Sequence, residues 1–94
     1  MPSPRIAVID FETTGISPTQ GDRATEVAIV LTEAGRVVDR FQSLMNAGVR
    51  IPSFITQLTG ITNDMVRAAP PAEQVMPVSW VMNEGMRTPA FIRL

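Results

Sequence analysis

The decisive stretch of this chain is Val8-Ile9-Asp10-Phe11-Glu12-Thr13-Thr14-Gly15, which closes an apolar run and opens a turn. Side chains at positions i and i+2 of a β-strand point to the same face, so Asp10 and Glu12 are predicted to project together. Two carboxylates held this close repel each other, and a divalent cation relieves the repulsion. The pattern therefore predicts a pair of metal ligands, with two solvated acids at a strand end as the alternative for a bare D-x-E pattern.

The composition is that of one small globular domain. The chain has 94 residues, of which 45% are hydrophobic and 18% are charged, a balance typical of a folded rather than a disordered chain. It contains no cysteine and no histidine, which excludes thiolate catalysis and favours oxygen ligands, hence Mg²⁺ or Mn²⁺ over Zn²⁺. The net charge of −1 argues against a large basic surface for duplex DNA.

Neither a membrane-spanning segment nor a signal peptide is evident in the sequence. No apolar run approaches the ~20 residues that cross a bilayer, and the first residues lack a charged segment followed by an apolar one. We therefore expect a cytoplasmic protein with no membrane partner.

Three strands are predicted in the first half of the chain. Residues 5–11 are apolar on both faces, as in a central strand, and residues 26–32 are dense in β-branched side chains. Residues 36–44 alternate in part and follow a short turn at residues 33–35. Short connections between consecutive strands predict an antiparallel three-stranded meander.

Short helices are predicted after the strands. Ser53 is the expected N-cap of a helix that ends near Gly60, and Thr62 is the expected N-cap of a helix over residues 63–67. A further helix is expected over residues 72–76, with proline at its start and another proline just after it.

Two stretches resemble one enzyme family, the DEDD superfamily of 3′–5′ exonucleases. The first is residues 8–15, which resemble the first motif of the DnaQ-like branch, the branch of the proofreading epsilon subunit of bacterial DNA polymerase III. The second is Ile51-Pro52-Ser53-Phe54-Ile55-Thr56-Gln57-Leu58-Thr59-Gly60-Ile61-Thr62-Asn63-Asp64-Met65, which resembles the "I-x-x-L-T-G-I-T-x-x-M" segment of the same enzymes. The resemblance implies an α/β, ribonuclease H-like fold. Residues 1–76 would form its N-terminal half and residues 77–94 a tail without a family match.

The resemblance also implies a reaction, the two-metal hydrolysis of the terminal phosphodiester at a single-stranded nucleic-acid 3′ end. Asp10 would bridge two Mg²⁺ or Mn²⁺ ions, and Glu12 would hold the ion that binds the attacking water. Gly15 would let the backbone turn sharply beside the site. The residues implied to contact the terminal nucleotide are Phe11, Thr13, Thr14, Gly15, Leu58, Thr59, Gly60 and Ile61.

Structural explanations compete with several of these roles. Leu58 and Ile61 are equally compatible with core packing, and the Thr59-Gly60 pair with a helix C-cap. Among the other acids only Glu26 is a candidate ligand. Asp22 and Glu33 are expected to be solvated in turns, and Asp39 to be solvated or paired across strands. Arg23 is the best candidate for a phosphate contact.

The sequence lacks parts that the family's reaction needs. The enzymes use four acids and a histidine or tyrosine base, whereas this chain has no histidine and no tyrosine, and Arg87 stands where the second motif would need aspartate. We therefore expect little or no nuclease activity from this chain alone, unless a polymerase or another second chain completes the site. The alternatives are a binding remnant without catalysis and a non-functional truncated product.

The resemblance places the strand over residues 5–11 at the centre of a sheet, with a fourth strand on its far side. The tail shows no match to that strand of the family, and within it residues 78–82 are predicted to form a short strand. The sequence therefore predicts an exposed strand edge, and either self-association through it or its coverage by residues 78–82.

Overall fold

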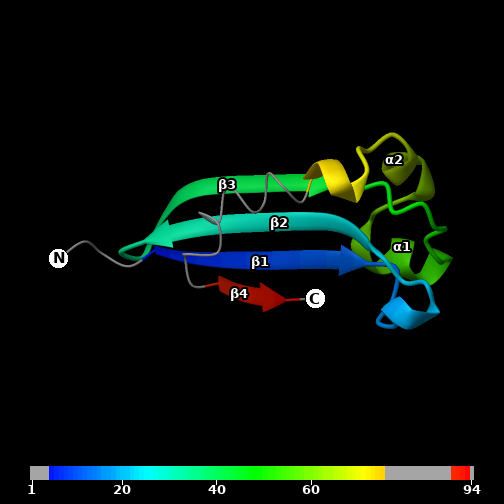
Figure 1. The fold of residues 1–94 in the computed structure, drawn as a ribbon, viewed down its shortest axis with the longest axis horizontal. Helices are drawn as coiled ribbons and strands as arrows, with labels where there is room; N and C mark the ends of the chain where they lie inside the picture. Colours follow the sequence, from blue (N-terminus) through cyan, green and yellow to red (C-terminus); the bar gives the residue numbers. More distant parts are fainter. Residues whose placement is uncertain (1–4, 76–89, 94) are drawn as a thin grey trace.

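A single twisted sheet forms the body of the protein in the computed structural model, which describes residues 5–75 and 90–93 (Figure 1). The strand order is β3-β2-β1-β4. The elements are β1 (Arg5–Thr13), the 3₁₀ helix η1 (Pro18–Gln20), β2 (Ala24–Glu33), β3 (Arg36–Leu44), α1 (Ser53–Thr59), α2 (Asn63–Arg67) and β4 (Ala90–Arg93).

The predicted antiparallel meander is confirmed, because β2 pairs antiparallel with both β1 and β3. The bounds of β3 are as predicted, whereas β1 and β2 are longer than predicted at the end that carries the acids. That extension includes a register shift, after which Thr13 pairs with Ala24. At the other end, Ala34 and Gly35 both have positive φ angles, 52° and 77°. Tight hairpin turns whose twist matches that of the strands require such angles.

One face of the sheet, the core face, carries the main hydrophobic core. Alternate residues of β1 and β2 point into it, and segments that follow β3 cover it. The buried members of this cluster are Ala7, Ile9, Val27, Ile29, Leu31, Met45 and Val75.

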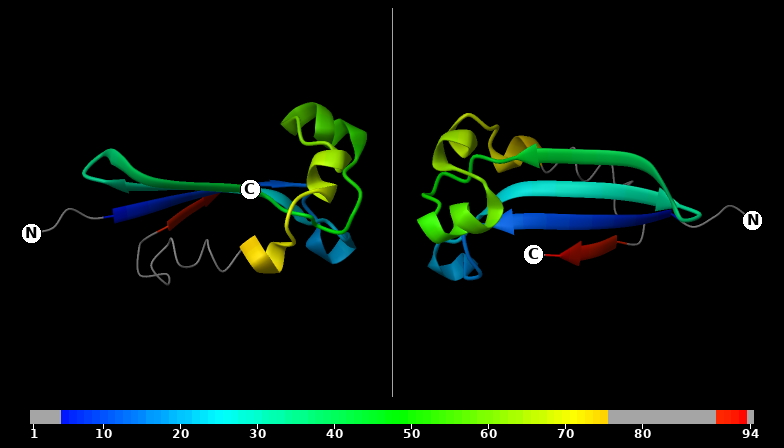
Figure 2. Two further views of the ribbon diagram at one scale, coloured as in Figure 1. Left: turned by 90° about the horizontal axis from the view of Figure 1, so that it is seen from above. Right: turned by 180° about the vertical axis from the view of Figure 1, so that it is seen from behind.

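The opposite face, the acid face, carries Asp10 and Glu12, and the described residues cover it near one end. There Leu44 packs against a second apolar cluster formed by Ile51, Ile61 and Val66, from α1, α2 and their connections. Seen along the sheet, α1 and α2 lie on one side, and the short helical stretch at residues 72–75 lies on the other (Figure 2). The two helices therefore stand beside the end of β1 where the acids lie.

The helix caps confirm one prediction and correct another. Thr62 caps α2 as predicted, and its side chain accepts a hydrogen bond from the Met65 N–H. Ser53 is not the N-cap of α1: it is the first helical residue, Pro52 precedes it, and no side chain caps this end. Gly60 ends α1 with a φ of 78°, as predicted for a C-cap glycine.

The far edge of β1 was predicted to be exposed, but it is paired in the structure. β4 pairs with it in parallel, with Ala7 opposite Ala90 and Asp10 opposite Arg93. The prediction failed because residues 90–93 show no recognisable strand pattern, so their pairing could not be read from sequence. Self-association through this edge thus loses its basis over residues 7–10, and the predicted strand at residues 78–82 lies outside the described residues. Within those, no helix has the length and apolarity to cross a membrane.

Candidate active site

Asp10 and Glu12 lie on the acid face of β1, where their alternation along the strand points both side chains the same way. Both residues are half-buried. The next strand places Ala28 opposite Asp10 and Glu26 opposite Glu12. Glu26 is therefore the cross-strand neighbour of Glu12 and not of Asp10.

Glu26 is already engaged within the sheet. Its Oε2 accepts a hydrogen bond of 3.1 Å from Nε2 of Gln42 on β3. In the described part of the chain, no three acidic side chains come close enough together to form a metal site. The donor set thus fits a hard divalent cation in part, because two carboxylates on one face supply oxygen ligands but no third acid joins them.

A β-bulge at Thr25 shapes the strand beside Glu12. Glu12 pairs with Glu26 and Thr13 with Ala24, so Thr25 is the extra residue. Its buried hydroxyl donates a 3.1 Å hydrogen bond to the carbonyl of Glu12. Bulges bend a strand and redirect the neighbouring side chains. The bulge thus fixes the main chain at the second acid.

The turn after β1 is held by its own hydrogen bonds. The Thr14 N–H donates to the carbonyl of Arg23 at 2.9 Å, and the Thr13 hydroxyl donates to the carbonyl of Gly15 at 2.8 Å. Glycine was predicted at position 15 because of a sharp backbone turn, but the φ of Gly15 is not positive, so the turn does not require glycine. A Cβ at this position would instead lie 2.3 Å from an oxygen of Asp22. Close approach is the reason for glycine here.

A groove of about 480 Å³, the end groove, opens between this turn and α1. Its walls come from the end of β1, the loop that contains η1, the start of β2 and one side of α1. The lining residues are Phe11, Glu12, Thr13, Gly15, Ile16, Pro18, Asp22, Arg23, Ala24, Ile55, Leu58 and Thr59.

Some of the residues predicted to contact a nucleotide line the end groove, and others serve the fold. Leu58 lines it and is 79% exposed, so it is not a core residue. Ile61 is buried in the second cluster, and the N–H of Gly60 donates to the carbonyl of Thr56 as a C-cap. Thr14 is buried beneath the turn. The predicted contacts with a nucleotide stay predictions for Phe11, Thr13, Thr14, Gly15, Leu58, Thr59, Gly60 and Ile61.

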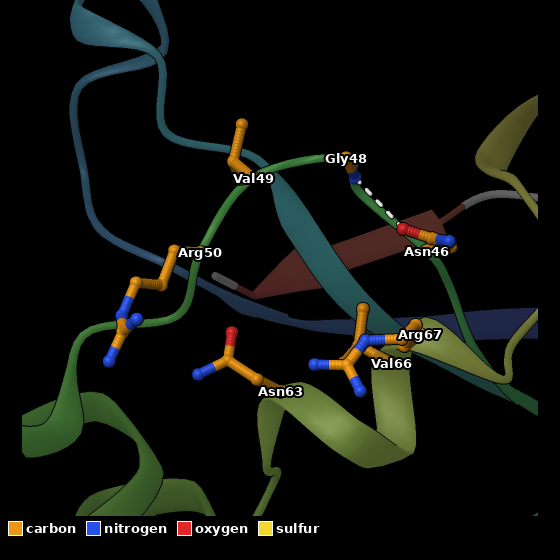
Figure 3. A pocket seen from close by; sticks show the side chains of 7 residues that line it. All are labelled: Asn46, Gly48, Val49, Arg50, Asn63, Val66 and Arg67. Atoms are coloured by element: carbon orange, nitrogen blue, oxygen red, sulfur yellow. Dashed lines mark hydrogen bonds between the residues drawn. The ribbon is translucent and has the colours of Figure 1, made fainter.

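A second hollow lies between the loop at residues 46–50 and α2 (Figure 3). The polar groups at its rim serve the fold. The Asn63 amide accepts from the N–H of Ile51 and donates to its carbonyl, and Arg67 forms an ion pair with Asp64. This hollow shares no lining residue with the end groove, so the two are separate, and neither Asp10 nor Glu12 lines it.

Sequence reasoning missed the parts of the site that depend on long-range contacts. Thr25 lies just before the strand predicted over residues 26–32 and was given no role, and Asp22 was expected to be a solvated turn residue. The structure places Thr25 against the main chain of Glu12 and Asp22 against Gly15. A local signal is weak in both cases, because Thr is common in strands and Asp in turns.

The chain matches one protein family over most of its length. The family model for RNase T, described as "Exonuclease", matches residues 7–87. This match extends beyond residue 76, where the motif resemblance ends. Among curated proteins, the 3′-5′ exonuclease DinG of Bacillus subtilis is 48% identical over 71 residues, which are 76% of this chain and 8% of DinG. A PolC-type DNA polymerase III of Caldanaerobacter subterraneus is 43% identical over 70 residues, 74% of this chain and 5% of the polymerase.

Solved structures show the same fold. The nuclease domain of 3′hExo, a DEDDh family member bound to rAMP, aligns with a TM-score of 0.74 and 27% identity over 96% of this chain and 50% of that one. Exonuclease X in complex with 5′ overhanging duplex DNA aligns with a TM-score of 0.69 and 30% identity over 79% of this chain and 42% of that one. The predicted ribonuclease H-like fold is thereby confirmed. The chain spans less than a tenth of these curated relatives and about half of these two structures.

Proposed function

Because this chain belongs to the exonuclease family, we propose that it forms the N-terminal part of a 3′–5′ exonuclease domain and holds a single-stranded nucleic-acid 3′ end in the end groove. One observation carries the proposal: Glu12 lines the same groove as the turn at Thr13 and Gly15 and the exposed side of α1. The groove thus brings both matched motifs, which are distant in sequence, to one place.

Asp10 and Glu12 are the residues that would hold Mg²⁺ or Mn²⁺, since hard cations prefer carboxylate oxygens. A bound ion of this kind supplies charge stabilisation at a phosphodiester. Asp10 and Glu12 lie on one strand, and the hydroxyl of the bulge residue Thr25 on β2 holds the main chain at Glu12. Their relative placement is therefore set by the sheet and not by a mobile loop.

The walls of the groove suit a terminal nucleoside. Leu58 and Phe11 offer apolar surface to a base or sugar. The Thr59 hydroxyl already donates to the Ile55 carbonyl and accepts from the Ile61 N–H. Thr59 would therefore contribute shape to the groove more than a free hydroxyl.

Arg23 supplies the positive charge of the groove and is the proposed phosphate contact. Its Nη1 donates to the carbonyls of Pro18 and Asp22, at 3.0 Å and 2.8 Å. These bonds hold the guanidinium at the rim, and the group has five N–H donors in all, so donors remain for a phosphate.

Hydrolysis by these 94 residues alone is proposed to be slow or absent, because the chain has no histidine or tyrosine to act as base. A second chain that brings two more acids and a base would restore it. A binding module without catalysis is the second candidate function. In the described residues no third acid completes a metal-binding group with Asp10 and Glu12, and this favours the binding module.

The test measures binding and cleavage separately. Fluorescence anisotropy compares a linear single-stranded oligonucleotide with a circle of the same sequence, with and without Mn²⁺. We expect Mn²⁺-dependent binding of the linear form only, and loss of that binding in Asp10→Ala and Glu12→Ala. The control is Asp39→Ala, which changes an exposed acid on β3. Equal binding of circle and linear forms would contradict the proposal.

Cleavage is followed as release of a 3′ label under the same conditions. We expect no more than trace release. Rapid release that disappears in Asp10→Ala would show that the chain is an active nuclease by itself and would exclude the binding-only function.

A further inference from the structure

The Asp22 side chain accepts hydrogen bonds from two separate residues of the loop that follows β1. Its Oδ1 accepts a 3.0 Å hydrogen bond from the Thr14 hydroxyl, and its Oδ2 accepts a 3.0 Å bond from the Ser17 N–H. The Asp22 N–H in turn donates to the Ser17 carbonyl at 3.1 Å. One side chain thus joins both ends of the loop at residues 14–22.

The Thr14 hydroxyl extends this network into β2. It donates to Asp22 and accepts a 3.0 Å hydrogen bond from the N–H of Arg23. The Thr14 side chain is buried, with 3% of its surface exposed. Since buried hydroxyls are costly to leave unpaired, the Asp22 carboxylate completes a chain of bonds that the fold needs at this point.

Gly15 is the complement of the Asp22 carboxylate. All three atoms of that carboxylate would lie 2.3–2.7 Å from a Cβ at position 15, closer than real Cβ atoms approach their neighbours. The backbone of Gly15 therefore packs closely against the Asp22 carboxylate. A larger residue at position 15 must displace Asp22, and a displaced Asp22 releases Thr14 and Ser17.

We propose that Asp22 is a positioning residue for nucleotide binding. Its carboxylate locks the turn at Thr13 and Gly15 in the shape that faces the end groove, and through the Thr14 hydroxyl it also holds the main chain of Arg23. This inference rests on the proposed function of the groove. It gives Asp22 a role that differs from metal binding, because both carboxylate oxygens already accept hydrogen bonds from the loop.

Two donors face the two oxygens of the Asp22 carboxylate. In Asp22→Asn, the NH₂ group can face the Thr14 hydroxyl, which rotates to accept, while the amide oxygen still accepts from the Ser17 N–H. The amide thus keeps both contacts, whereas Asp22→Ala removes both acceptor oxygens and is the substitution that tests the inference.

The experiment uses thymidine 5′-monophosphate with Mg²⁺ as the probe, titrated into the chain by NMR, beside amide hydrogen exchange at Ser17. Asp22→Ala should bind the nucleotide about tenfold or more weakly, because small misplacements in a site are amplified, and should lose protection of the Ser17 amide. The control is Asp64→Ala, the same change at an exposed aspartate that does not line the groove. It should alter neither measurement.

A double substitution tests the fit between Gly15 and Asp22 directly. Gly15→Ala alone should weaken nucleotide binding and reduce protection at Ser17. In the Asp22→Ala background the added Cβ meets no carboxylate, so Gly15→Ala should have little further effect. Additive effects of the two substitutions would overturn the inference, as would unchanged binding in Asp22→Ala.

The exchange measurement separates failure of this inference from failure of the proposed function. A wild-type chain that binds no nucleotide would overturn the proposed function and, with it, the role of Asp22 in positioning. A wild-type chain that binds the nucleotide while its Ser17 amide exchanges freely would overturn the role of Asp22 alone.

Discussion

The two faces of the sheet are made by the same strands and yet differ in what holds them. The core face buries Val27 and Ile29 almost completely, whereas Val8 on the acid face is 42% exposed. Among the described residues, α1 and α2 cover the acid face near Leu44. Apolar packing therefore stabilises one face, and the other is left open for polar side chains.

The difference teaches where stability and function are separated in this small domain. Side chains of a strand alternate between faces, so neighbours in sequence such as Ile9 and Asp10 serve opposite purposes. The polar segments around the acids are held by specific hydrogen bonds, such as those of Asn63 and Thr25. Substitutions on the two faces should accordingly have different effects.

The largest effect is expected from Val27→Ala on the core face. Val27 has no exposed surface, so removing two methyl groups there should lower the free energy of unfolding by about 2–3 kcal/mol. Val8→Ala, the same change on the acid face, should lower it by about 1 kcal/mol or less. Urea denaturation of both variants measures the difference, and equal losses would show that the acid face is as tightly packed as the core.

Asn63→Ala should have the next largest effect, because Asn63 bonds to both the N–H and the carbonyl of Ile51. Loss of these two bonds should lower the free energy of unfolding by about 1–3 kcal/mol, with partly buried groups left unpaired. Asn46→Ala is the matched control, since the Asn46 side chain accepts only from the exposed Gly48 N–H. Thermal unfolding followed by circular dichroism compares them. A larger loss in Asn46→Ala would mean that polar contacts do not hold the cover of the acid face.

The helix caps allow a smaller and sharper comparison. Thr62→Ala removes the side chain that accepts from the Met65 N–H and should lower the free energy of unfolding by about 0.5–2 kcal/mol. Ser53→Ala should change it by less than about 0.5 kcal/mol, because Ser53 is a helical residue and caps nothing. The reverse order in urea denaturation would restore Ser53 as the N-cap of α1.

Sequence reasoning was most successful where the signal is local. Alternation and turn residues predicted the meander, and Thr62 and Gly60 were identified as caps because capping depends on neighbours in sequence. The pairing of β4 with β1 was missed, since strand partners in a parallel pair are distant in sequence. The contact of Asp22 with Gly15 was missed for a similar reason: it spans a loop whose shape no residue pattern fixes.

The two motifs predicted the location of the site better than its details. They pointed to Asp10, Glu12 and the segment around Leu58, and the structure brings Glu12 and Leu58 to one groove. They could not distinguish residues that line the groove from residues that pack beneath it. Ile61 shows this, because its burial depends on contacts with Ile51 and Val66 that only the folded chain forms.

The smallest effect on stability is expected at the acid itself. Glu12→Gln removes a charge from the acid face and leaves its size unchanged, so the free energy of unfolding should change by less than about 0.5 kcal/mol. Mn²⁺ binding, measured by paramagnetic broadening of amide signals near residues 10–12, should nevertheless be lost, since an amide is a far weaker ligand than a carboxylate. Glu33→Gln is the control, because Glu33 forms only an exposed ion pair of 3.4 Å with Arg5. Broadening that persists in Glu12→Gln would place the cation elsewhere and would contradict the proposed role of the acid face in metal binding.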